Sequence, residues 1–154
     1  MLCGGGLIWA AVAGWGGFAV ATSQSEEGLS RRERLRIDVQ DICPMSGEKL
    51  DREQPLKQWT EPESKERFYV CCEACLDAKP DPSNLESIRK NRIAAQPKCL
   101  VMDNEVTIDS ESRILEGYRV YVCCPPCFKK IEKSAEKHWS KLDAMHVEYL
   151  KERK

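Results

Sequence analysis

Residues 68–75 read FYVCCEAC, and residues 120–127 read VYVCCPPC. A lone cysteine precedes each run by a few tens of residues, Cys43 in the first case and Cys99 in the second. These two copies of one pattern contain eight of the nine cysteines of the chain. A thiol cluster built twice with the same layout indicates two soft-metal sites or two thiol-redox sites rather than ordinary core packing.

The composition is that of small modules with thin hydrophobic cores. The 154 residues include 25 acidic and 24 basic side chains, so the formal net charge is only -1. No global field therefore favours nucleic acid, and we expect no nucleic-acid partner. Charged residues make up 32% of the chain and aromatic residues 7%. Domains of this size and composition often need a metal or disulfides for stability.

The N-terminal residues carry the strongly apolar stretch of the sequence. It spans residues 2–21 and ends in Ala19-Val20-Ala21, a pattern that signal peptidase cleaves. We expect residues 1–21 to be a signal peptide, and the protein to be exported to a periplasm or the extracellular space. The alternative is an uncleaved anchor, because about 20 apolar residues can span a bilayer. Contact with a membrane is expected only in that second case.

Four segments follow from the changes in composition along the chain. Residues 22–36 are polar and charged without an apolar period, and we interpret them as a flexible linker after the segment 1–21, with a little helix as the alternative. The first module spans residues 37–96 and the second module residues 97–154. We expect a small α+β fold in which each module has a cysteine turn, a β-hairpin and a helix led by CCxxC, with a longer helix at the C-terminus.

The local signals within each module support this plan. Strands are predicted over residues 56–59 and 67–70 in the first module, and a hairpin turns at Glu116-Gly117 in the second. Apolar residues at helical spacing from Phe128 to Tyr149 predict either one long helix or two helices with a bend near Ser134. His138 and His146 lie on this terminal segment, where we expect them to be partly exposed.

Thiolate chemistry explains why cysteines occupy these positions. Cys72 and Cys124 stand at predicted helix starts, where unpaired backbone N–H groups stabilise negative charge. Two sulfur atoms from a helix start and one from a facing turn can converge on a tetrahedral ion. This is the general plan of treble-clef-like zinc modules.

The two copies resemble tandem heavy-metal-binding domains of the YHS/TRASH type. The similarity lies in CPMSG followed by FYVCCEAC, and in CLVMD followed by EGYRVYVCCPPCFKKIEKSAEKHW. It covers about residues 40–80 and 96–142. The resemblance implies metal sensing, trafficking or resistance, with the following ligands: Cys43, Cys71 and Cys75 in the first module, and Cys99, Cys123 and Cys127 in the second. Cys72 and Cys124 would be alternative or additional donors.

Both copies depart from related modules that have Cys-x-x-Cys at the first turn. Ser46 and Met102 stand where the second cysteine of that turn would be. Each site then has room for a labile or three-coordinate soft ion, and we expect about one zinc or copper(I) ion per module. Met102 is an additional candidate ligand, because a thioether suits copper(I); the alternative is that it packs under the hairpin.

Three functions remain open after these observations. The first is metal binding for trafficking, sensing or buffering, with a protein partner in metal handling. The second is a structural zinc scaffold for protein interaction. The third is an exported protein stapled by disulfides or active in thiol redox chemistry. The sequence has no nucleophile–base pair, phosphate loop or HExxH motif, so we expect no enzymatic activity.

Overall fold

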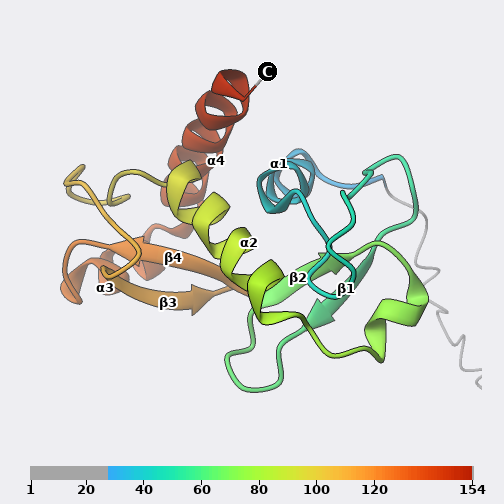
Figure 1. Cartoon of the computed structure of the whole chain (residues 1–154). Coiled ribbons are helices and arrows are strands. Elements are labelled where there is room, and N and C mark those ends of the chain that lie inside the picture. Colours follow the sequence, from blue (N-terminus) through green and yellow to red (C-terminus); the bar gives the residue numbers. More distant parts are fainter. Residues whose placement is uncertain (1–27, 154) are drawn as a thin grey trace, which may run out of the picture.

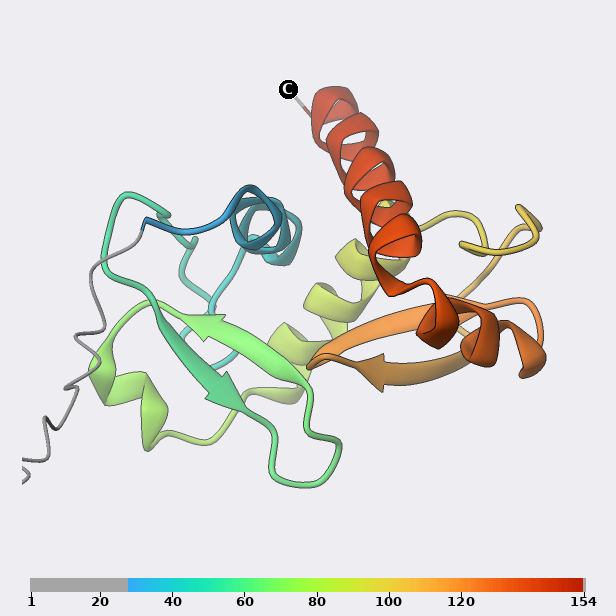
Figure 2. The ribbon, with the colours of Figure 1, turned by 180° about the vertical axis from the view of Figure 1, so that it is seen from behind.

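Two antiparallel β-hairpins lie on either side of helix α2 (Pro82–Ala95) in the computed structural model of the chain, which describes residues 28–153 (Figures 1 and 2). Helices α1 (Arg31–Gln40) and α4 (Ala135–Glu152) both pack against α2 and against each other. The described residues therefore form a small mixed α+β fold with one hairpin per module, as predicted. The proposed signal peptide or anchor, residues 1–21, lies outside the described residues.

The first hairpin is formed by β1 (Lys57–Thr60) and β2 (Arg67–Val70), with Lys57 opposite Val70. Its position agrees with the two predicted strands. The helix predicted after Cys72 is only a single 3-10 turn, η1 (Glu73–Leu76). The short element is followed by Pro80 and Pro82, which restrict the residues before them to extended backbone and prevent a longer helix.

The second hairpin is formed by β3 (Glu111–Leu115) and β4 (Tyr118–Val122), and it turns at Glu116-Gly117 as predicted. Both turn residues have positive φ, 50° and 78°, which is the geometry of a type I′ turn. A Cβ on Gly117 would come within 2.0 Å of Nε of Arg67. The Arg67 N–H donates to the Gly117 carbonyl at 2.8 Å, so the tip of the second hairpin is joined to the first.

The C-terminal segment consists of two helices that meet at Ser134, which is one of the two predicted alternatives. Helix α3 (Pro126–Lys133) and helix α4 are separated there by non-helical backbone at φ -142° and ψ 51°. The apolar residues of the predicted stripe lie in the core of the second module: Phe128, Ile131, Trp139 and Leu142 are buried.

Residues 31–36 of the segment predicted as a linker are helical, because α1 begins at Arg31. Ser30 and Glu33 form a capping box at its start, each side chain bonding the other residue's backbone N–H. Arg32 then joins α1 to α4 through ion pairs with Glu136 at 2.8 Å and Asp143 at 3.0 Å. The helix is therefore part of the folded unit.

A glutamine clamp recurs in both modules and extends the repeat to include the preceding helix. At the end of α1, the Gln40 amide donates to the Tyr69 carbonyl at 2.7 Å and accepts from the Tyr69 N–H at 2.9 Å. After α2, Gln96 makes the same pair of bonds with Tyr121, at 2.6 and 3.1 Å. Each clamp fixes the strand two residues before the cysteine pair.

Helix α2 consequently serves both modules. Its residues Leu85 and Ile88 pack with Phe68 of the first hairpin, while the residue after its end, Gln96, clamps the second hairpin. The boundary predicted between residues 96 and 97 falls at the end of this shared helix. Its N-cap is Asp81, whose carboxylate accepts from the Ser83 N–H at 2.8 Å.

The histidines are buried, contrary to the expectation of partial exposure. His138 is 8% exposed and His146 is fully buried. The ring nitrogen Nε2 of His146 lies 3.4 Å from the Tyr118 hydroxyl. Burial, followed by the positive charges of Arg36 and Arg92, lowers the pKa of His146 from 6.5 to about 3. His146 is thus neutral in the folded protein at neutral pH.

We predict that His146 makes the fold sensitive to mild acid. An unfolded histidine takes up a proton near pH 6.5 and the folded one only near pH 3, so the unfolded chain binds more protons between these values. The stability that the neutral, buried His146 contributes is fully present above the unfolded pKa of 6.5 and is lost as the pH falls below it. When the pH is lowered from about 7.5 to about 5.5, the free energy of unfolding measured with urea should fall by about 1.4 kcal/mol more in the wild type than in His146→Gln.

The matched control for this prediction is His138→Gln, which removes the other buried histidine and keeps His146. This variant should retain the additional acid sensitivity of the wild type. Equal pH dependence in the wild type and in His146→Gln would contradict the assignment to His146.

Candidate metal centres

The two turn cysteines sit in tight loops of the same construction. The Cys43 N–H donates to the Glu48 carbonyl at 2.8 Å, and the Cys43 carbonyl accepts from Gly47 at 2.9 Å. In the second module, Cys99 makes the matching bonds with Asn104 and Asp103, at 2.8 and 3.1 Å.

The fifth residue of each loop has positive φ, 74° at Gly47 and 58° at Asp103. Glycine has no steric cost there, and aspartate is one of the few other residues that visits this region routinely. The second loop therefore keeps the shape of the first without the glycine.

Three sulfur atoms converge at each loop. The first sulfur group comprises Cys43, Cys71 and Cys75, and the second comprises Cys99, Cys123 and Cys127. Within each group all sulfur atoms lie within 4.8 Å of one another. The turn supplies the first member, the residue after the hairpin supplies the second, and η1 or α3 supplies the third.

The spacing of these sulfur atoms suits a common ion. Zinc–sulfur bonds of about 2.3 Å in a tetrahedron place sulfur atoms roughly 3.8 Å apart. The sulfur atoms of Cys71 and Cys75 are 3.7 Å apart. The turn and helix cysteines of both groups are buried, and the strand-end cysteines are half-buried. Each group therefore has one side open to solvent.

Cys72 and Cys124 lie beside the sulfur groups rather than inside them. The sulfur of Cys72 is 3.5 Å from that of Cys75, and the sulfur of Cys124 is 3.4 Å from that of Cys127. Cys72 is exposed and Cys124 half-exposed. Both modules thus have a fourth thiol at the outer edge, and its role as an additional donor stays a prediction.

Backbone N–H groups surround the turn cysteine in each module. Burial alone would raise the pKa of Cys43, but N–H groups of Ser46, Cys71 and Met45 point at its sulfur and bring the pKa down to about 7. Cys99 has the same environment, since N–H groups of Cys123, Met102 and Val101 outweigh burial and lower its pKa. Each turn cysteine is therefore the thiol of its sulfur group that ionises most readily.

The other members of the groups resist ionisation. Burial raises the pKa of Cys75, Cys123 and Cys127, and the neighbouring thiols raise it further. At Cys71 the Ser46 hydroxyl lowers the pKa, but burial and the adjacent Cys43 raise it, so that the net pKa is above its usual value. Three thiolates this close repel one another unless a cation lies between them. A bound metal ion would supply that charge and displace the protons.

The residues at the position of a fourth turn ligand differ between the modules. The Ser46 hydroxyl is directed to the first sulfur group, 3.5 Å from the sulfur of Cys71. The Met102 side chain is 52% exposed, so the alternative in which it packs under the hairpin is wrong. Its backbone N–H, in contrast, faces the Cys99 sulfur.

Sequence reasoning missed the glutamine clamps that support both centres. Gln40 and Gln96 each precede the turn cysteine by three residues, and this equal spacing in the sequence could have identified them. Each holds the strand that ends at the second cysteine of its group. Mutation of groups that orient metal ligands in this way often lowers metal affinity by about tenfold or more.

All eight cysteines of the described part of the chain are free thiols. Their closest sulfur–sulfur distances, 3.4 to 3.7 Å, are far longer than the 2.05 Å of a disulfide bond. Residues 28–153 therefore contain no disulfide bond in this structure.

Within residues 28–153, none of the helices has the length and apolarity needed to cross a bilayer. Comparison of the chain with protein-family models, with curated proteins and with solved structures finds no match. The two sulfur groups and their surroundings are therefore the features that indicate a function.

Proposed function

We propose that this chain is a metal-binding protein that holds one zinc or copper(I) ion in each of its two sulfur groups, in metal trafficking, sensing or buffering. The observation that carries the proposal is the convergence of three cysteine sulfur atoms within 4.8 Å, twice, in loops of the same construction. Soft thiolate ligands select zinc and copper(I) among the common metal ions.

The openness of the sites favours exchange over a purely structural role. A structural zinc site is usually closed by four protein ligands, whereas each group here has three converging thiols and a fourth at its outer edge. An ion held by only three converging thiols has an open coordination position, where an incoming ligand can bind before a protein thiolate leaves. We accordingly place the structural zinc scaffold second.

The proposal also covers the type of the two modules and the compartment in which they bind metal. Their order of cysteine turn, hairpin and CCxxC-led turn or helix supports modules of the YHS/TRASH type. The Ala19-Val20-Ala21 pattern supports export, with residues 1–21 removed or retained as an anchor. The protein would then receive or deliver its ions outside the cytoplasm through a partner in metal handling.

A transfer experiment tests this function. The chain is loaded anaerobically with two equivalents of zinc, mixed with a chromophoric chelator, and followed over time. Transfer within minutes is expected for trafficking or buffering, and it should be faster in Cys72→Ser and Cys124→Ser, in which the site loses its fourth thiol. Ions that stay bound for hours, and leave only when the chain unfolds, would overturn the trafficking role and indicate a structural scaffold.

We predict that the second module binds copper(I) more tightly than the first, because Met102 offers a thioether where Ser46 offers a hydroxyl. Met102 lies in the turn that begins at Cys99, and its side chain is exposed. Met102→Ser should weaken copper(I) binding at that site about tenfold, and zinc binding less. Anaerobic competition with a copper(I) chelator measures this, with Ser46→Thr as the control that keeps the hydroxyl. An unchanged copper(I) affinity in Met102→Ser would exclude Met102 as a ligand.

A further inference from the structure

The two loops that hold the turn cysteines share one backbone shape but differ in charge. The residue five positions after the turn cysteine is Glu48 in the first loop and Asn104 in the second, and its carbonyl accepts from the turn cysteine in both. The equivalent side chains are thus a carboxylate and a neutral amide. Because the two sulfur groups are built alike, this difference in charge can separate their metal preferences.

The Glu48 carboxylate lies at the edge of the first sulfur group. Its Oε2 atom accepts from the Cys71 thiol at 3.5 Å and lies at the same distance from the Ser46 hydroxyl, which is itself 3.5 Å from the Cys71 sulfur. Cys71 is the half-buried member of its group, on the side that is open to solvent. The charge of Glu48 is therefore directly beside a candidate ligand of the first site.

Each loop contains one charged residue, and only that of the second loop is neutralised. In residues 99–104 this residue is Asp103, whose carboxylate lies 2.6 Å from Nζ of Lys141 on α4. In residues 43–48 it is Glu48, which forms no ion pair within the described residues 28–153. The first loop thus carries an uncompensated negative charge beside its thiols, whereas the charge of the second loop is balanced.

Charge distinguishes the two ions that a group of three thiolates can bind. Zinc is divalent and copper(I) is monovalent, and both accept sulfur ligands. A neighbouring carboxylate attracts zinc more strongly by one unit of charge, while its repulsion of the three thiolates is the same for either ion. Glu48 is exposed, so the dielectric constant of water is the appropriate one. A unit charge about 4 Å from an ion then changes its binding about fivefold.

We propose that Glu48 determines the metal specificity of the first sulfur group by favouring divalent zinc over copper(I). It acts through its charge beside Cys71 and does not have to bind the ion itself. This inference rests on the proposed function, because it requires an ion in the first sulfur group. It is independent of the Met102 thioether, which belongs to the second loop.

Site-resolved competition titrations of the full chain test this proposal. The chain is titrated anaerobically with zinc or with copper(I) against a chelator of known affinity. The NMR signals of the Gly47 and Asp103 N–H groups report the occupancy of the first and the second site. The measured quantity is the ratio of the copper(I) Kd to the zinc Kd at each site. Glu48→Gln should lower this ratio about fivefold at the first site and leave the second site unchanged.

Three further variants separate the effect of charge at this position from other effects. Glu48→Asp keeps the charge and should retain most of the preference for zinc. Glu63→Gln removes an exposed carboxylate from the loop between β1 and β2 and should leave the ratio at the first site unchanged. Asn104→Glu places a carboxylate at the equivalent position of the second loop and should raise the ratio at the second site.

The outcomes distinguish this inference from the function on which it rests. If the wild type and Glu48→Gln both bind zinc and copper(I) with the same ratio at the first site, the role of Glu48 is overturned and the metal-binding function stands. If the wild type binds neither ion, the proposed function itself is overturned, and the role of Glu48 with it.

Discussion

Replacing Cys123 and Cys127 together by serine removes about one of the two ions that we expect per chain. Both residues belong to the second sulfur group, and Cys127 is 1% exposed within the core of the second module. Serine oxygens are poor ligands for soft ions, and the two thiols that remain, Cys99 and the outer-edge Cys124, are too few to hold one tightly. Because metal binding and folding are coupled in such modules, the second hairpin should lose most of its order.

Metal analysis and NMR of the same sample measure this outcome. The matched control is Cys71→Ser with Cys75→Ser, which should remove the other ion and affect mainly the first hairpin. All four substitutions together should leave no bound ion. Full metal content in Cys123→Ser with Cys127→Ser would show that the ligand assignment is wrong.

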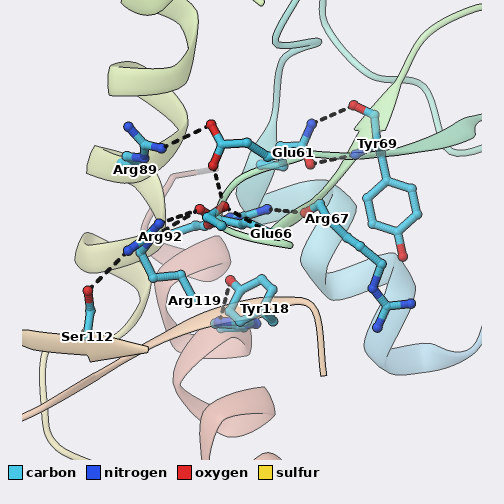
Figure 3. A network of polar contacts seen from close by, with 12 residues as sticks. Glu61, Glu66, Arg67, Tyr69, Arg89, Arg92, Ser112, Tyr118 and Arg119 are labelled. Carbon is cyan, nitrogen blue, oxygen red and sulfur yellow. Dashed lines mark hydrogen bonds and ion pairs between the residues drawn. The ribbon is translucent and has the colours of Figure 1, made fainter. Parts of the chain in front are cut away.

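Glu66→Gln is expected to destabilise the fold by about 3–5 kcal/mol, because it breaks a buried ion-pair network. The Glu66 carboxylate is fully buried and accepts from Arg92 of α2 and from Arg119 of β4, the latter at 2.8 and 3.0 Å (Figure 3). Arg92, itself 2% exposed, also donates to the Arg67 carbonyl at 3.0 Å. Neutralising Glu66 would leave two arginines facing each other without a counter-charge.

The network joins the two modules through Glu66 and Arg119, so its loss should also weaken the contact between them. Urea unfolding of the metal-loaded chain measures the effect, which should persist at high salt because the network is shielded from solvent. Glu63→Gln changes the same charge on the same loop at an exposed position and should alter stability by less than about 0.5 kcal/mol. A Glu66→Gln variant as stable as Glu63→Gln would contradict this account.

Local signals in the sequence predict a large part of the fold. The branched and aromatic residues before each cysteine pair predict the strands β2 and β4, and Glu116-Gly117 predicts the hairpin turn between β3 and β4. The resemblance of the two copies to YHS/TRASH-type modules also implies, as ligands, the six cysteines that converge in the two sulfur groups.

What the sequence did not predict depends on contacts between distant segments. Helix α1 has few apolar residues, so the linker interpretation allowed only a little helix there, although the capping box at Ser30 and Glu33 is present in the sequence. The burial of His146 depends on Tyr118, 28 residues away, and that of Arg36 on Tyr118 and Trp139. Helical periodicity shows which face of a helix is apolar, but not which polar residue a partner element covers.

The central claim is that each module holds one ion on three cysteine sulfur atoms. Metal analysis of the anaerobically purified chain, combined with X-ray absorption at the metal edge, tests it most directly. The account predicts about two zinc or copper(I) ions per chain, with at least three sulfur neighbours at about 2.2–2.3 Å from each ion. A chain without metal whose cysteines are paired in disulfides, or ions coordinated mainly by nitrogen and oxygen, would contradict it.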